Sequence, residues 1–135
     1  MKLTVLAVGR LRPPYVDDVE HYSRLLTRHA KLELVEIREG DRVQRRLPAD
    51  TFVSLLDVDG TRYDSVQFAG FIEERRQAGR DVCFVIGGAM GLELSGVEHR
   101  FSLGPLTLPH QLARVVLLEQ LYRAHKIIAG ETYHY

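Results

Sequence analysis

The sequence is poor in cysteine, lacks tryptophan and contains no long apolar run. Its single cysteine, Cys83, excludes a disulfide within the chain, and we expect it to be a small buried side chain in a cytoplasmic protein. No CxxC or HxxxH spacing is present, so we expect no metal site. No apolar stretch approaches the roughly 20 residues that span a bilayer, so we expect neither a membrane segment nor a signal peptide.

The chain also lacks an excess of charge of either sign, because 18 basic residues balance 18 acidic ones. A protein dedicated to nucleic-acid binding usually has a basic balance, so composition alone argues mildly against this function. Arginine nevertheless supplies 15 of the 18 basic residues, and several arginines are clustered. The cluster Arg42, Arg45 and Arg46 differs from ordinary solvated charge because it lies in a predicted loop with only Asp41 nearby.

Apolar segments with strand and helix spacing alternate along the chain, which predicts a single α/β domain with a mostly parallel sheet. We expect a turn at Asp57–Gly60 to close the third strand, a loop over Arg38–Asp50, and a short helix or turn over Leu92–His99. Helices are predicted from Tyr15, from Asp64 or Ser65, and from Pro109. The predicted strands are Leu3–Val8, Leu32–Ile37, Thr51–Leu56, Val82–Ile86 and Phe101–Leu103.

The last predicted helix begins at Pro109, ends before Gly130 and has apolar residues on more than one face. A helix that covers one sheet needs a single apolar stripe, so the second stripe predicts contact with a second subunit. The chain then closes with Tyr133, His134 and Tyr135. Such aromatic and titratable groups are found in sites, while a disordered terminus is the alternative interpretation.

Three predicted strands end in loops that can hold a ligand, because ligands of parallel sheets bind at the carboxyl ends of the strands. These loops are Leu56–Asp57, Gly87–Gly91 and Leu103–Leu108. The glycines of the second loop either allow close backbone approach to a ligand or make a tight turn. His110 is either a polar helix start or a functional group. Residues 9–14 lack a GxGxxG pattern and a P-loop is absent, which argues against nicotinamide and nucleoside-triphosphate binding.

Three motifs together resemble one family: IGGAMG after the fourth strand, LTLPHQLARVVLLEQLYRA over the last helix, and TYHY at the end. They are similar to the ribosomal RNA large subunit methyltransferase H family, small SPOUT-class enzymes that methylate N3 of a pseudouridine in helix 69 of 23S rRNA. MKLTVLAVGR and LLDVDGTRYDSVQFA also fit, so the resemblance spans nearly the whole chain. It implies a Rossmann-like, mostly parallel sheet of five to six strands with a C-terminal trefoil knot, the knot and cofactor region covering about 82–135.

The resemblance also implies a site. S-adenosylmethionine would lie in the knot, His110 and His134 would be the candidate acceptors of the N3 proton, and Tyr133 would stack on or orient the base. A homodimer joined through the C-terminal helix is implied as well, with a composite active site that acts on 23S rRNA of assembled ribosomes. The residues that match the family's cofactor contacts are Leu56, Gly87, Leu103, Gly104, Pro105, Leu106, Thr107 and Leu108.

The chain departs from the family pattern at two places. Between Glu39 and Thr51 it is about twenty residues shorter, so a crossover helix is missing or reduced to a loop, and one sheet face is less covered. Tyr135 occupies a position that is usually basic. Two alternatives therefore stand beside the methyltransferase: a knotted RNA- or ribosome-binding dimer with weakened catalysis, and a SPOUT enzyme acting on another RNA position.

Overall fold

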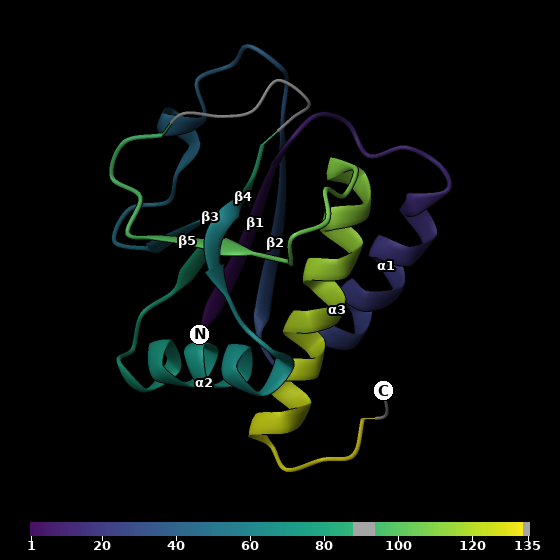
Figure 1. Cartoon of the computed structure of the whole chain (residues 1–135), viewed down its shortest axis with the longest axis vertical. Coiled ribbons are helices and arrows are strands. Elements are labelled where there is room, and N and C mark those ends of the chain that lie inside the picture. The colour runs from purple at the N-terminus through teal and green to yellow at the C-terminus, as the bar shows by residue number, and fades with distance from the viewer. Residues whose placement is uncertain (88–93, 134–135) are drawn as a thin grey trace.

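The computed structural model describes residues 1–87 and 94–133. Its centre is a five-stranded sheet in the order β2-β1-β4-β3-β5, and every neighbouring pair of strands is parallel (Figure 1). This arrangement confirms the predicted parallel α/β sheet, while the trefoil knot stays a prediction. The strands are β1 (Lys2–Val8), β2 (Lys31–Ile37), β3 (Phe52–Arg62), β4 (Val82–Ile86) and β5 (His99–Ser102).

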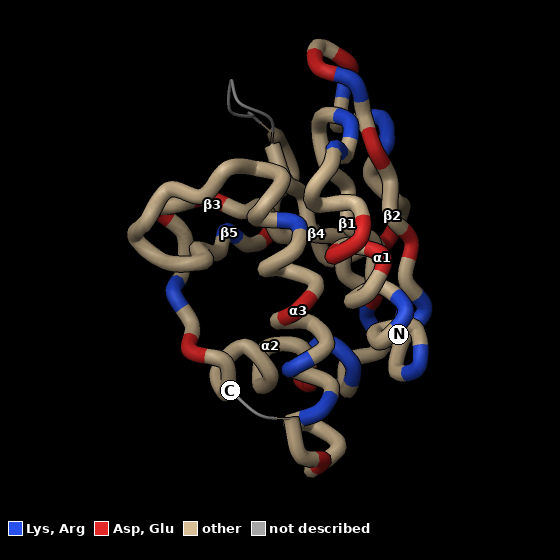
Figure 2. The backbone as a smooth tube through the Cα atoms, turned by 90° about the vertical axis from the view of Figure 1, so that its right-hand side faces the viewer, with Lys and Arg blue, Asp and Glu red and all other residues tan. Residues whose placement is uncertain are grey.

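Three long helices cover one face of the sheet, and α3 lies between the other two (Figure 1, Figure 2). The steps from β1 to β2 and from β3 to β4 run in the same direction across the sheet, so right-handed crossovers place α1 and α2 on the same face. The step from β2 to β3 runs the opposite way, and its connection crosses the other face, where Val43 packs. The helices are α1 (Tyr15–Leu26), α2 (Ser65–Gln77) and α3 (His110–Ile128).

The core of this three-helix face is built from the apolar stripe of α3. Leu117, Leu121 and Ala124 are completely buried, as expected for residues three or four positions apart on a helix. They pack against strand residues that include Leu3 and Phe84, which are also completely buried. The helix starts after Pro109 and ends before Gly130, where φ is +68°, so the predicted boundaries are confirmed.

The opposite face is covered more thinly. Within the described residues, the only helix on the connection from β2 to β3 is the short 3₁₀ helix η1 (Val43–Arg46), where the sequence predicted a loop. Val43 is 3% exposed and packs with Val8, Val53 and Val85 in a second, smaller core. A 3₁₀ turn of four residues covers far less sheet than an α-helix does, so this connection is a shortened crossover.

The predicted turn at Asp57–Gly60 was wrong, because these residues lie inside β3. The pairing of β3 with β5 shifts between Leu56 and Thr61, both of which are opposite Phe101. The strand therefore bulges outward instead of ending. Gly60 makes the bulge possible, since a Cβ atom at this position would lie 2.6 Å from the backbone carbonyl carbon of Arg100 on β5.

Two further expectations concern the second half of the sheet. The fifth strand is His99–Ser102, which begins two residues and ends one residue earlier than predicted, and residues 94–98 before it are not helical. Most of the glycine-rich turn and the start of the predicted Leu92–His99 segment lie outside the described residues.

Cys83 is completely buried as predicted, and burial raises the pKa of its thiol to about 12. No helix in the described ranges is long and apolar enough to cross a membrane.

Candidate functional site

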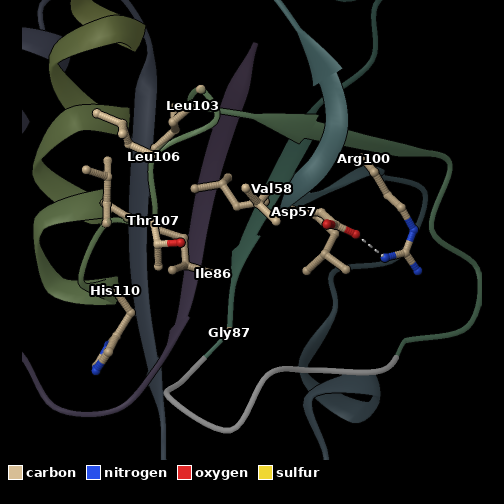
Figure 3. A pocket seen from close by; sticks show the side chains of 14 residues that line it. Asp57, Val58, Ile86, Gly87, Arg100, Leu103, Leu106, Thr107 and His110 are labelled. Atoms are coloured by element: carbon tan, nitrogen blue, oxygen red, sulfur yellow. Dashed lines mark hydrogen bonds and ion pairs between the residues drawn. The ribbon is translucent and has the colours of Figure 1, made fainter.

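A cavity of about 340 Å³ opens at the carboxyl edge of the sheet, between the ends of β3, β4 and β5 and the start of α3 (Figure 3). This is where a parallel sheet is expected to hold a ligand. Seven of the eight predicted cofactor positions line the cavity, and Pro105 is the one that does not. The seven are Leu56, Gly87, Leu103, Gly104, Leu106, Thr107 and Leu108.

The loop after β5 is turned into the cavity by a tight hydrogen-bonded bend. The hydroxyl of Ser102 donates to the carbonyl oxygen of Gly104 at 2.9 Å, and the Gly104 amide donates back to Ser102 Oγ at 3.0 Å. Gly104 has a φ of +129°, which only glycine adopts without strain. The bend leads directly into Leu106–Leu108, which form one wall of the cavity.

The cavity has an apolar base and polar groups on two sides. Leu55, Ile86 and Ala113 contribute apolar surface together with the leucines already named. On one side Arg100 Nη1 lies 2.9 Å from Asp57 Oδ2, and in Figure 3 Thr107 and His110 lie on the opposite side of the cavity. Such a mixture, apolar with a few fixed polar groups, is typical of small-molecule sites.

Asp57 is held in its charged form. The backbone amide of Asp59 donates to the Asp57 carboxylate at 2.9 Å, and this bond, followed by the bond from Arg100, lowers the pKa of Asp57. Sequence reasoning placed Asp57 at a strand end but missed Arg100. The only signal for Arg100 was its position in the predicted link to the fifth strand, which does not distinguish it from other surface arginines.

His110 lies at the N-terminus of α3 and lines the cavity. Its Nδ1 atom is buried and has no hydrogen-bond partner among the described residues. The ring packs against Gly9, where a Cβ atom would lie 3.4 Å from His110 Cε1. Gly9 has a φ of +103°, a conformation that favours glycine, so the imidazole lies beside a residue with no side chain. A buried ring nitrogen without a partner is uncommon, and it leaves a polar atom at this site for a bound molecule to satisfy.

Gln111, the next residue of α3, fixes the loop that follows β1. The backbone amide of Arg12 donates to Gln111 Oε1 at 2.7 Å, and Gln111 Nε2 donates to the carbonyl oxygen of Arg10 at 2.5 Å. Gln111 is 8% exposed, so its side-chain oxygen and nitrogen both find hydrogen-bond partners in a buried position. The loop with Arg10 and Arg12 is therefore held beside His110.

Arg114, one turn further along α3, ties the same region to β2. Its Nη2 donates to the carbonyl oxygen of Gly9 at 2.6 Å and its Nη1 donates to Glu36 at 2.7 Å, while the residue as a whole is 4% exposed. Partial burial works to raise the pKa of Glu36, but hydrogen bonds from Arg114 and from the Leu11 amide outweigh it, so this pKa is lowered. The sequence pattern did not single out either residue of this pair.

Tyr133 lies away from the cavity within one chain. Its hydroxyl donates to Glu119 Oε2 at 2.9 Å, and its ring lies under the guanidinium of Arg123 at 4.5 Å. Burial first, and then the hydrogen bond to Glu119, raise the pKa of Tyr133 to about 12. Glu119 is nine residues after His110, about 13 Å along the helix axis, so a single chain does not bring the two predicted site residues together. His134 lies outside the described residues.

Among the described residues, no cluster of three or more His, Cys, Asp or Glu side chains is arranged to hold a metal ion. The cavity therefore offers backbone groups, one ion pair, a hydroxyl and an imidazole as its polar chemistry. These groups can bind a polar organic molecule and exchange a proton with it.

Known proteins resemble this chain over nearly its whole length. A family model described as "Predicted SPOUT methyltransferase" matches residues 1–134. A protein of Rubrobacter xylanophilus named ribosomal RNA large subunit methyltransferase H is 44% identical, with 99% of this chain and 98% of that protein aligned. Proteins of the same name from Gemmatimonas aurantiaca and Acetivibrio thermocellus are 40% and 37% identical, each aligned over 99% of both chains.

These alignments extend over 153 to 158 positions, whereas the chain has 135 residues. Each of these relatives thus has at least 18 positions without a counterpart here, in agreement with the expected shortening. A solved structure, a probable methyltransferase from Bordetella pertussis Tohama I, shares the fold with a TM-score of 0.60, 14% identity, and coverage of 91% of this chain and 93% of that one. The resemblance found in the motifs is confirmed, and the chain belongs to the SPOUT methyltransferase family.

Proposed function

We propose that this protein is an S-adenosylmethionine-dependent enzyme that methylates N3 of a pseudouridine in helix 69 of 23S rRNA, on assembled ribosomes. Residues 1–135 would form one SPOUT domain, with the knot and cofactor region at about 82–135. The observation that carries the proposal is the convergence of seven predicted cofactor positions and His110 on one cavity. Support for the RNA substrate comes from relatives of nearly full-length similarity whose name is ribosomal RNA large subunit methyltransferase H.

The cavity suits the proposed cofactor. Its volume of about 340 Å³ falls within the range of small-ligand sites. The loop 103–108 presents backbone groups and leucine side chains, which can hold an adenine ring and a thioether chain without charged side chains. When bound, S-adenosylmethionine supplies a methyl group on a positively charged sulfonium. The contribution of the protein is then to hold the acceptor nitrogen in line with that methyl group.

The proton on N3 of the base needs an acceptor. His110 suits this role because it lines the cavity and its buried Nδ1 has no partner among the described residues. His134 is the second candidate in the proposal. Tyr133, with its hydroxyl on Glu119, is suited to stacking on or orienting the base and not to accepting a proton, since its pKa is raised to about 12.

A homodimer would bring these groups together. Leu112, Val115 and Val116 on α3 are only partly buried, and Ile127 is 37% exposed, so part of the helix retains an apolar surface. If two α3 helices pack through this surface, Tyr133 of one copy can reach the cavity of the other, which the separation within one chain does not allow. Light scattering at micromolar concentration tests this point, and a stable monomer would contradict the composite site.

The decisive experiment uses ribosomes from cells that lack the modification. They are incubated with the protein and labelled S-adenosylmethionine, and the labelled nucleotide is mapped by mass spectrometry. Label on the helix 69 pseudouridine, absent when the base is uridine, is the expected result. Label elsewhere would favour a different RNA position. If a folded dimer binds the cofactor but transfers no label, the protein is better described as a binding module with weakened catalysis. The shortened 39–51 segment and Tyr135 would then be the features that explain the weakened catalysis.

A further inference from the structure

The arginines of this chain fall into two groups by their partners. Seven of the 15 form ion pairs with carboxylates. A guanidinium already paired with a carboxylate has part of its charge and its donors engaged. These paired arginines are Arg24, Arg75, Arg76, Arg80, Arg100, Arg114 and Arg123.

Six other arginines gather beyond the carboxyl ends of β1 and β2, and we call them the basic edge. In the part of the chain that the structure describes, none of their side chains forms an ion pair or a hydrogen bond, and all six are exposed. Figure 2 shows several blue segments at the upper end of the molecule, above the labels of β1 and β2. The basic edge consists of Arg10, Arg12, Arg38, Arg42, Arg45 and Arg46.

The charge of this edge is not cancelled locally. Residues 9–12 and 38–46 contain the six arginines and two acids, Glu39 and Asp41, and so carry four net positive charges. The neighbouring carboxylate of Glu36, near Arg10, is paired with Arg114. The whole chain has a net charge of zero, so the remainder of the molecule is net negative by the same amount. A neutral protein with one positive edge can steer a polyanion to that edge and away from the rest of its surface.

The arginines of η1 stand on a fixed support. Val43 is 3% exposed and anchors the turn in the smaller core. The side chain of Gln44 clasps the backbone of Ser95, donating to its carbonyl oxygen at 2.9 Å and accepting from its amide at 3.1 Å. Because this turn is held at two points, the backbone that carries Arg45 and Arg46 loses little conformational entropy on binding.

The other end of the basic edge lies beside His110, although none of its arginines lines the cavity. Gln111 holds the backbones of Arg10 and Arg12, and the neighbouring residue His110 lines the cavity. The unpaired arginines thus extend from η1, along the carboxyl edge of the sheet, to the residue proposed to act at the base. A single chain of RNA whose base enters the cavity would have its backbone over this edge.

We infer that the basic edge binds the phosphodiester backbone of the RNA on the side of the cavity next to His110. This inference rests on the proposed function for the identity of the substrate. Guanidinium groups bind phosphate oxygens through two parallel hydrogen bonds, which ammonium groups do not match, and every cation of the basic edge is an arginine. The shortened connection between β2 and β3 then has a role of its own, as the support for three of these contacts.

The test measures RNA binding as a function of salt. The probe is a fluorescein-labelled RNA hairpin with the helix 69 sequence, and its anisotropy is followed between about 50 and 200 mM KCl. The variant R42Q/R45Q/R46Q is compared with R28Q/K31Q/R62Q, which removes three exposed cations that also lack ion pairs among the described residues but lie outside the basic edge. Binding of S-adenosylmethionine, measured on the same samples, reports that each variant is folded.

The expected result is a loss of hairpin affinity of at least tenfold in R42Q/R45Q/R46Q, with a salt slope shallower by about 2, since each lost phosphate contact removes about 0.7 from the slope. R28Q/K31Q/R62Q should keep the wild-type slope, and R42K/R45K/R46K should keep the slope but bind more weakly. An unchanged slope in R42Q/R45Q/R46Q, or an equal change in the control, would overturn the inference. If these slopes are observed but the wild type transfers no methyl group to ribosomes, the basic edge stands and only the proposed reaction fails.

Discussion

The two faces of the sheet differ in how they are built. The three-helix face holds 18 buried apolar residues in its described core, including all five phenylalanines of the chain. The opposite face holds eight, none of them aromatic, under η1 and the segment that contains Leu94 and Val97. Because apolar burial is the main source of stability, the three-helix face carries most of it. The opposite face, which we call the thin face, contributes less to stability and carries charged groups at the carboxyl edge of the sheet.

The largest expected effect tests this difference in the aromatic core. Phe84 is completely buried, with Phe68 and Phe101 within 6.2 Å between ring centroids. Phe84→Ala should lower the free energy of unfolding by about 3–5 kcal/mol, because it removes a large side chain and leaves a cavity. Urea denaturation at one fixed protein concentration measures this, and Phe84→Leu serves as the control with a smaller loss. A loss below about 1 kcal/mol would contradict the assignment of the main core.

The next effect concerns the link between α3 and the cavity. Arg114→Ala removes the hydrogen bonds to Gly9 and Glu36 and should cost about 2–3 kcal/mol in unfolding free energy, as for bonds to charged groups. Arg114→Lys should recover part of it. The pKa of Glu36 is lowered in the folded state. Its contribution to folding stability is therefore fully present at pH values above its ordinary pKa of 4.5, and is lost as the pH falls through the folded pKa.

Glu36→Gln tests the direction of this pH dependence. In urea denaturation between about pH 6 and pH 3, the stability difference between wild type and Glu36→Gln should shrink as the pH falls, because protonation removes the charge on which the bond to Arg114 depends. A difference that stays constant over this range would show that Glu36 does not contribute through its charge.

On the thin face, the expected loss is smaller. Val43→Ala removes two methyl groups from a side chain that is 3% exposed and should cost about 1–2 kcal/mol. If Val43 supports the basic edge as inferred, this variant should also weaken binding of the RNA hairpin, while Val66→Ala on the 68% exposed position of α2 should change neither property. A loss as large as that of Phe84→Ala would show that the two faces contribute equally to stability.

The smallest effect is a pH dependence within the three-helix face. His99 is hydrogen-bonded to Ser54 at 2.7 Å and to Tyr63 at 2.9 Å, and burial, followed by the positive charge of Arg75, lowers its pKa. The unfolded chain therefore takes up a proton at a higher pH than the folded one. Stability should be retained above the ordinary histidine pKa of 6.5 and should decline as the pH falls below it.

His99→Gln should flatten this decline, whereas the exposed His21→Gln should leave it unchanged. Thermal unfolding between about pH 7.5 and pH 5 gives both slopes. His125 also has a pKa lowered mainly by burial, so a residual decline is expected in His99→Gln. A decline of wild-type size in His99→Gln would exclude His99 as its source.

Much of this architecture could be predicted from the sequence because it depends on local patterns. Val82–Ile86 is apolar at every position, as a central strand requires, and Pro109 and Gly130 mark the ends of α3. The bulge in β3 could not be predicted, since Asp57–Gly60 has the composition of a turn and only pairing with β5 makes it a strand.

The site divides in the same way. The cofactor positions follow from the strand ends and the family motifs, so most of them meet at one cavity. The pairing of Arg100 with Asp57 and of Arg114 with Glu36 joins residues 43 and 78 positions apart, and no spacing rule indicates such pairs. The position of Tyr133 relative to His110 likewise depends on packing, which places the tail against the middle of α3.

Gly60 sets a limit on how this sequence can vary. The β5 backbone passes so close that any Cβ atom at position 60 would lie 2.6 Å from the amide nitrogen of Phe101. Even alanine, usually the mildest replacement, would have to push β5 aside, and β5 runs directly into the loop that walls the cavity. In a saturation library selected for methyl transfer, position 60 should therefore accept no replacement, although it lies outside the cavity lining and carries no functional group. The variation that this site tolerates therefore depends on the close approach of the β3 and β5 backbones at Gly60 as well as on the groups that line the cavity.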